Sequence, residues 1–173
     1  INLNNSKHFL IDASVTNFNT NQWNSYPALN GFDGHVTFNE NRGMAALETR
    51  DASTLWPNLF RSGIDIDKLT GTIAWGKTGQ GWLIVGPALF GQHGDLKMLG
   101  RVKIVLDRQS KFGDFVDAGI EFAEGDLEGL RQYLNLNRIS PKTADHINQI
   151  IQAGRLNSAS LLLFGRVKQF PYI

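Results

Sequence analysis

The sequence predicts a mainly β chain of the α+β class, an antiparallel sheet interrupted by an inserted helical hairpin. Three observations favour this fold. Apolar and polar residues alternate with a period of two in several runs, and turn sequences rich in glycine and asparagine separate these runs. Between residues 126 and 153 the apolar positions instead follow the period of about 3.6 residues that is typical of helices.

The alternating runs mark the expected strands, because every second side chain of a strand lies on the same face. Their apolar positions are Phe9, Ile11, Ala13 and Val15; Val36 and Phe38; Leu69, Gly71, Ile73 and Trp75; Val102, Ile104 and Leu106; Val116, Ala118, Ile120 and Phe122; and Leu161, Leu163, Gly165 and Val167. Residues 30–34, 39–43, 77–81 and 111–114 carry turn chemistry that suits hairpins. The prediction is therefore an antiparallel meander.

Two of the expected strands are apolar at successive positions, namely residues 82–85 and residues 161–164. Both faces of the sheet should meet a non-aqueous environment there. One face can meet the core. The other can meet the helices, a neighbouring domain or an apolar ligand.

The second expected helix has the clearer boundaries. Ser140 suits the N-cap, Pro141 suits the first helical position, and Gly154 suits the position just past the end. Its apolar stripe is Ala144, Ile147, Ile150 and Ile151. The first helix should begin after Asp126 as its N-cap and end near Asn135, with an apolar side made of Leu127, Leu130, Tyr133 and Leu134. Together these helices predict a hairpin over about residues 126–153.

The segment from residue 51 to residue 67 is harder to interpret. Its apolar residues Leu55, Trp56, Leu59 and Phe60 suit either a short helical turn or a strand broken at Pro57, and the helical turn is favoured.

Length and composition predict one β-rich unit over residues 1–173, cut from a longer protein because the chain begins at Ile1 rather than methionine. The formal charge is +1 and the basic residues are scattered, which argues against nucleic-acid binding. The chain has no cysteine, which excludes thiol chemistry and disulfides. No apolar run approaches the roughly 20 residues of a membrane-spanning helix.

No motif predicts a catalytic centre, a metal site or a cofactor. His8, His35, His93 and His146 lack partners at metal-ligand spacing. Asp65 and Asp67 are two residues apart, so on a strand they would share a face, and this pair leaves open a glycan-binding or glycan-processing enzyme. We favour a solvated strand edge there. We interpret Trp23, Trp56, Trp75 and Trp82 as core or groove lining rather than stacking platforms.

Several short motifs follow one another in order along the chain. They are Leu69-x-Gly71-x-x-x-Trp75, Tyr133-Leu134, Pro141-Lys142, Ala153-Gly154-Arg155-Leu156, and Gly165 followed by Phe170-Pro171-Tyr172. Their order resembles the central region of the YhdP family of AsmA-like envelope proteins. The resemblance covers most of the chain from about Phe32 onward.

This resemblance implies a strongly curved sheet with an apolar inner groove. It also implies a periplasmic protein of a Gram-negative bacterium, anchored to the inner membrane outside this segment and linked to phospholipid traffic and the outer-membrane barrier. The expected partners are a phospholipid or another acyl-chain lipid and the flanking segments of the same chain.

We expect a non-catalytic segment whose groove shields acyl chains from water, since each exposed methylene costs about 0.8 kcal/mol. The expected lining residues are Ile73, Trp75, Leu83, Val85, Val102, Ile104, Ile120, Phe122, Leu161 and Leu163. The alternative is a structural scaffold that docks partners through the exposed edges of the sheet.

Overall fold

The structure is a computed structural model, and it describes residues 9–22, 27–56, 60–79, 81–107, 110–134, 140–150 and 154–166. Its elements in chain order are β1 (Ile11–Thr20), β2 (Ala28–Phe38), β3 (Arg42–Leu55), β4 (Ile64–Lys77), β5 (Gly81–His93), β6 (Leu96–Asp107), β7 (Phe115–Asp126), α1 (Leu127–Leu134), α2 (Pro141–Ile150) and β8 (Arg155–Arg166). Several predicted positions lie outside the described residues, namely His8, Trp23, Pro57, Leu59, Asn135, Ile151, Ala153, Val167 and residues 170–172.

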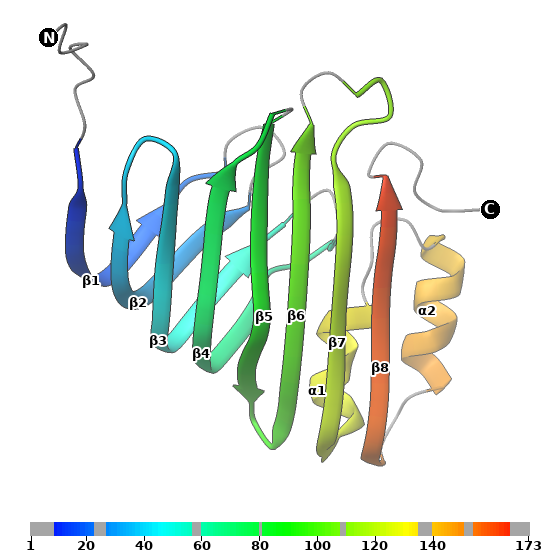
Figure 1. Cartoon of the computed structure of the whole chain (residues 1–173). Helices are drawn as coiled ribbons and strands as arrows, with labels where there is room; N and C mark the ends of the chain where they lie inside the picture. Colours follow the sequence, from blue (N-terminus) through cyan, green and yellow to red (C-terminus); the bar gives the residue numbers. More distant parts are fainter. Residues whose placement is uncertain are drawn as a thin grey trace, which may run out of the picture.

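The strands form one open sheet of eight strands in the order β1 to β8, and each pairs antiparallel with its neighbours in sequence (Figure 1). The mainly β fold and the antiparallel meander predicted from the alternating runs are therefore confirmed. A turn at residues 39–42 connects β2 to β3, and the N–H of Thr78 donates to the carbonyl of Gly81 between β4 and β5, as their sequences predict. The strands β1 and β8 are the two edges of the sheet.

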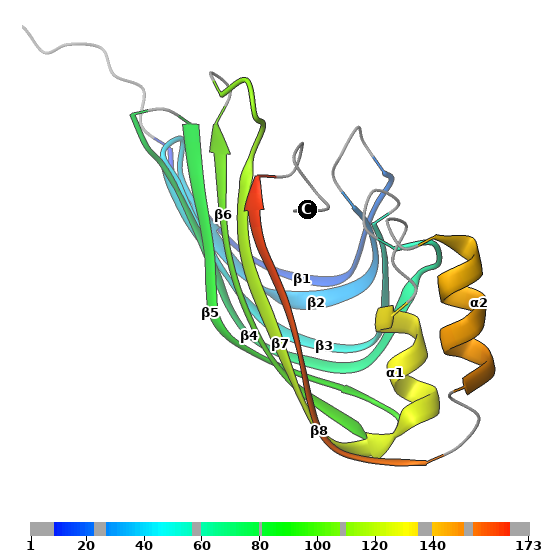
Figure 2. The same cartoon turned by 90° about the vertical axis from the view of Figure 1, so that its right-hand side faces the viewer.

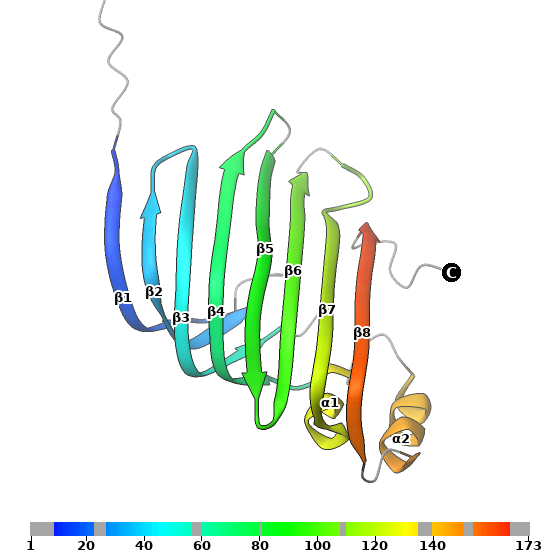
Figure 3. The same ribbon diagram turned by 60° about the horizontal axis from the view of Figure 1, so that its bottom comes forward.

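The sheet is strongly curved into a trough, with the strands running across it (Figures 2 and 3). Residues with positive φ interrupt the first three strands, at Asn17, Gly31 and Asp51. Gly31 also lies close to β3, because a Cβ there would come 3.1 Å from the carbonyl oxygen of Asp51. These irregularities increase the twist and bend of neighbouring strands.

The prediction of a hairpin turn at residues 30–34 is wrong. These residues lie inside β2, and the pairing with β3 shifts between Asn30 and Gly34. A glycine in the left-handed region suits a bulge within a strand as well as a turn.

The two helices lie between β7 and β8 in the sequence, at the expected places. The side-chain oxygen of Ser140 accepts a hydrogen bond of 3.1 Å from the N–H of Thr143, which confirms the predicted N-cap of α2. In the part of the chain that is described, no packing of α1 on α2 is shown. A helical hairpin as one unit is therefore not supported.

The core lies where α1 meets the sheet. Its buried residues are Phe60, Ile64, Leu96, Phe122, Leu130 and Tyr133, which we call the α1 cluster. The rings of Phe122 and Tyr133 are 5.1 Å apart. In the segment between β3 and β4, β3 continues to Leu55, and the N–H of Phe60 donates to the carbonyl of Trp56 at 2.8 Å.

Candidate functional site

One face of the sheet is apolar from edge to edge. Residues that pair across neighbouring strands project to the same side. One such row, which we call the central row, crosses the sheet through Ala13, Val36, Ala45 and Ile73 and continues through Gly86, Val102, Ala118 and Leu163. A Cβ on Gly86 would lie 3.1 Å from Val102 and 3.5 Å from Ile73, so the row continues across the irregular pairing of β4 and β5.

This apolar face is the concave face of the trough. Phe122 pairs with Ala159 and Met98 in the register that also contains the central row. Phe122 packs on Tyr133 of α1, and α1 lies inside the curve of the sheet (Figure 2). The curvature therefore encloses the apolar side of the sheet.

The register places eight of the ten predicted lining residues on this concave face: Ile73, Trp75, Val102, Ile104, Ile120, Phe122, Leu161 and Leu163. Leu83 pairs with Gly76, and Val85 pairs with Ala74, which places both on the convex face. Neither residue therefore faces the trough. That the other eight residues line a lipid groove stays a prediction, and Phe122 among them is buried against Tyr133 of α1.

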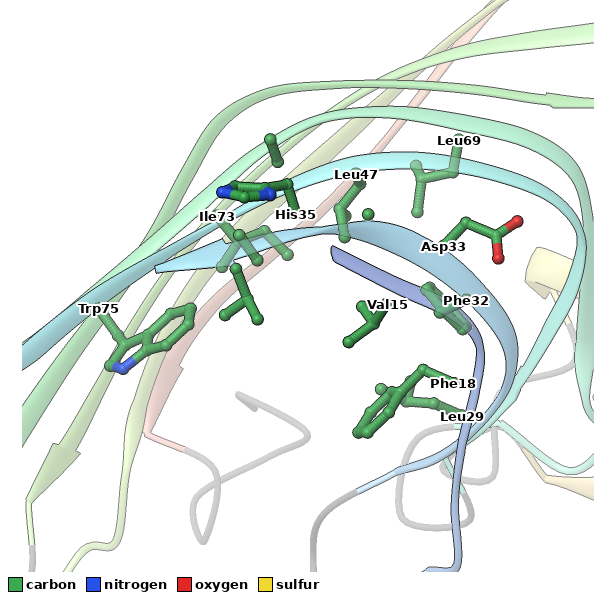
Figure 4. Close-up of a pocket in the computed structure, with 14 residues that line it drawn as sticks. Val15, Phe18, Leu29, Phe32, Asp33, His35, Leu47, Leu69, Ile73 and Trp75 are labelled. Atoms are coloured by element: carbon green, nitrogen blue, oxygen red, sulfur yellow. The ribbon is translucent and has the colours of Figure 1, made fainter. Parts of the chain in front are cut away.

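A cavity of about 410 Å³ opens on the concave face over β1 to β4 (Figure 4). It is lined by Val15, Phe18, Leu29, Phe32, Asp33, Gly34, His35, Val36, Ala45, Ala46, Leu47, Leu69, Ile73 and Trp75. A cavity of this volume can hold a small ligand or part of an acyl chain. Of the predicted lining residues, only Ile73 and Trp75 border it.

The two ionisable residues of this lining have their hydrogen-bonding groups engaged elsewhere. The carboxylate of Asp33 accepts a hydrogen bond of 2.7 Å from the N–H of Asn17. The imidazole of His35 lies 2.7 Å from the carboxylate of Asp12 and 3.2 Å from the hydroxyl of Ser14. The cavity therefore offers an apolar ligand a surface of aliphatic and aromatic side chains.

Trp75 depends on a glycine beside it. A Cβ at Gly43 would collide with the indole ring of Trp75 and with Cβ of Phe38. Only glycine leaves room for the indole to lie against β3 at this position. The ring then borders the cavity.

The residues of β1 to β3 that line this cavity are not among the lining residues predicted from the sequence. A signal was present, since Phe32, Gly34, Val36 and Phe38 alternate along β2. The assignment of residues 30–34 to a turn hid the first half of that run. Phe18 and Leu29 border a register irregularity between β1 and β2, where simple alternation fails.

The polar groups that suggested chemistry have structural partners. Asp67 accepts a hydrogen bond of 2.6 Å from the N–H of Gly94 and so fixes the turn between β5 and β6. Its other oxygen lies 3.3 Å from Nδ1 of His93, without the geometry of a hydrogen bond. Asp65 is exposed on β4 opposite Ser53. Within the described ranges, no group of three or more acidic or histidine side chains could hold a metal ion.

Neither helix, over the residues that the structure describes, has the length and apolar character needed to cross a membrane.

Comparisons with known proteins agree with the resemblance of the motifs. The sequence model of the family described as "YhdP protein" matches residues 1–173. The "Intermembrane phospholipid transporter YhdP" of Escherichia coli (strain K12) is 21% identical over 160 residues, which cover 92% of this chain. The chain spans only 12% of the length of that relative. No solved structure matches the chain.

Proposed function

Since the chain belongs to the YhdP family, we propose that it is a lipid-binding segment of an envelope protein, whose trough holds the acyl chains of phospholipids. The observation that carries this proposal is the central row, which crosses all eight strands without a polar side chain. The printed description of the Escherichia coli relative as an intermembrane phospholipid transporter supports the choice of ligand.

Physical chemistry favours acyl chains over head groups as the bound part. An acyl chain in the trough removes its methylenes from water, at about 0.8 kcal/mol each. A charged head group gains nothing from an apolar lining and would lose its hydration there. The head group should therefore remain at the open side of the trough, in water.

In this proposal the segment binds and conducts lipid and performs no reaction. It would act in the periplasm as one part of a protein anchored to the inner membrane, and would support lipid supply to the outer membrane. The polar groups nearest the cavity are bonded to neighbouring groups of the chain, which suits a passive surface.

Two neighbouring leucines of β8 provide a matched test. Leu163 belongs to the central row, whereas Leu162 lies on the convex face and is 63% exposed. In Leu163→Arg a guanidinium must enter the apolar trough, and we expect phospholipid binding to fall by about ten-fold or more. Leu162→Arg puts the same charge into water and should leave binding unchanged. The measurement is the phospholipid that co-purifies with the intact protein, by mass spectrometry.

Equal lipid content in the two variants, with both folded by circular dichroism, would contradict the proposed trough. Lipid-free wild-type protein that takes up no fluorescent phospholipid would contradict it as well. If Leu163→Arg fails to fold while Leu162→Arg folds, Ala118→Arg replaces it in the test, because Ala118 lies in the same row on β7. Ala123→Arg on the convex face is then the matched control.

A second candidate function is a scaffold that docks partners through the sheet edges. The open edges at β1 and β8 favour it, since unpaired backbone groups on an edge strand can pair with another strand. A scaffold predicts that neither Leu163→Arg nor Leu162→Arg changes lipid content, so the same pair of variants separates the two functions.

A further inference from the structure

We propose that α1 closes part of the concave face to lipid and thereby confines acyl chains to the central row. This inference rests on the proposed function, because it concerns the path that lipid takes along the same trough. It assigns a boundary role to Leu130 and Tyr133, the two described side chains of α1 in the cluster.

Among the described residues, α1 covers one side of the concave face. Under α1, Leu96 is 1% exposed and Phe122 is 3% exposed, while Tyr133 above them is 4% exposed. Met98 and Ala159, which pair with Phe122 on either side, also pack against this cluster. Protein side chains already fill the space that a lipid would need there.

The central row lies beside this covered region, and within the described ranges α1 does not cover it. None of its eight residues belongs to the α1 cluster or packs against it. Val102, Ala118 and Leu163 are half-buried, although their strands β6, β7 and β8 also carry the covered residues. The boundary between covered and open surface therefore runs along the trough, at Ile120 and Leu161.

Several contacts hold α1 in a fixed position at this side of the trough. The N–H of Leu127 donates to the carbonyl of Gly154 at 3.1 Å, which joins the start of the helix to the chain entering β8. The side chain of Leu127 also packs against the cluster, as does Leu156 of β8. Viewed along the trough, α1 stands on the side where β1 to β4 turn up into a second wall (Figure 2). It takes the place of that wall at the β8 end.

Two alanines of the concave face allow a direct test, because the chain contains no cysteine that would need to be removed. Ala118→Cys places a thiol in the central row, and Ala159→Cys places one beneath α1. The probe is a phospholipid with a maleimide at the end of one acyl chain, added to the intact protein without other cysteines. Ala123→Cys on the convex face is the control for reaction from water.

We expect Ala118→Cys to react with the acyl probe and Ala159→Cys to react about ten-fold or more slowly. A thiol under packed side chains can react only when the structure around it unfolds locally. Total thiol is measured after denaturation. Adding Tyr133→Ala should speed the reaction of Ala159→Cys and leave that of Ala118→Cys unchanged.

The outcomes separate this inference from the proposed function. Equal rates at positions 118 and 159 would overturn the boundary role of α1 while leaving the trough as a lipid site. Reaction at neither position beyond that of Ala123→Cys would overturn the proposed function itself. A rate at position 159 that Tyr133→Ala does not change would also count against α1 as the cover.

Discussion

At the residue scale, Thr49 joins two strands inside the bend of the sheet. Its side chain is completely buried. Its hydroxyl donates to the carbonyl of Asp33 at 2.8 Å and accepts from the N–H of Asp33 at 3.0 Å. The pairing of β2 with β3 is irregular between Asn30 and Gly34, so this hydroxyl takes the place of backbone hydrogen bonds that the two strands do not make there.

Thr49→Val keeps the shape of the side chain but removes both hydrogen bonds of Asp33. We expect it to destabilise this region by about 1–3 kcal/mol, because a backbone donor and a backbone acceptor lose their partner. Thr49→Ser keeps the hydroxyl and loses only a methyl group, worth about 0.8 kcal/mol. Amide hydrogen exchange at Asp33 measures the difference. Faster exchange in Thr49→Ser than in Thr49→Val would contradict this role.

At the scale of the strands, bends are built from residues with positive φ. Gly31 has φ of 75° and approaches the backbone of Asp51, which itself has φ of 53°. The two residues lie on neighbouring strands, so β2 and β3 bend together. A sheet without such irregularities would be flatter and would enclose less of its apolar face.

Gly31→Ala should therefore destabilise the fold by about 1–2 kcal/mol, since the left-handed region is unfavourable for residues with a Cβ. Gly76→Ala on β4 is the matched control. A Cβ there meets nothing closer than 4.0 Å, so the change should be neutral or stabilise by about 0.4–1 kcal/mol. Thermal melting of both variants tests the pair. Equal melting temperatures would show that Gly31 does not require its backbone conformation.

The strands also show how far the sequence determines the site. The apolar sides that alternation predicts for β4, β6, β7 and β8 lie on one face in the register, because those runs are regular over the trough. It could not assign a face to Leu83 and Val85, since residues 82–85 are apolar at every position. Only the pairing with Ala74 and Gly76 decides that question.

The bends and the α1 cluster could not be predicted from the periodicity of the sequence, for a different reason. Gly31 carries the same local signal in a hairpin turn and in a bulge, and the choice depends on β3, which is distant in sequence. The cluster joins Phe60 and Ile64 to Leu130 and Tyr133 across more than two complete strands. Periodicity predicted the helix, but tertiary packing decides which part of the sheet it covers.

At the scale of the whole molecule, the sheet is an open series of neighbouring strands. Over the described residues, each strand pairs only with the strands next to it in sequence, and β1 does not pair with β8. Stability should then vary along the series, as it does in repeat proteins, instead of being shared by one central core. The α1 cluster provides the main difference between its two ends.

The two edge strands allow this expectation to be tested. Both β1 and β8 have one unpaired side, but only β8 packs against the cluster, through Leu156, Ala159 and Leu161. In lipid-free protein we expect the amides of β1 to exchange on the order of ten- to hundred-fold faster than those of β8. Leu130→Ala should accelerate exchange in β8 and leave β1 unchanged, because none of the described residues that form or pack on the α1 cluster belongs to β1. Uniform protection from β1 to β8, or equal acceleration of both edges by Leu130→Ala, would mean that the sheet unfolds as a single cooperative unit.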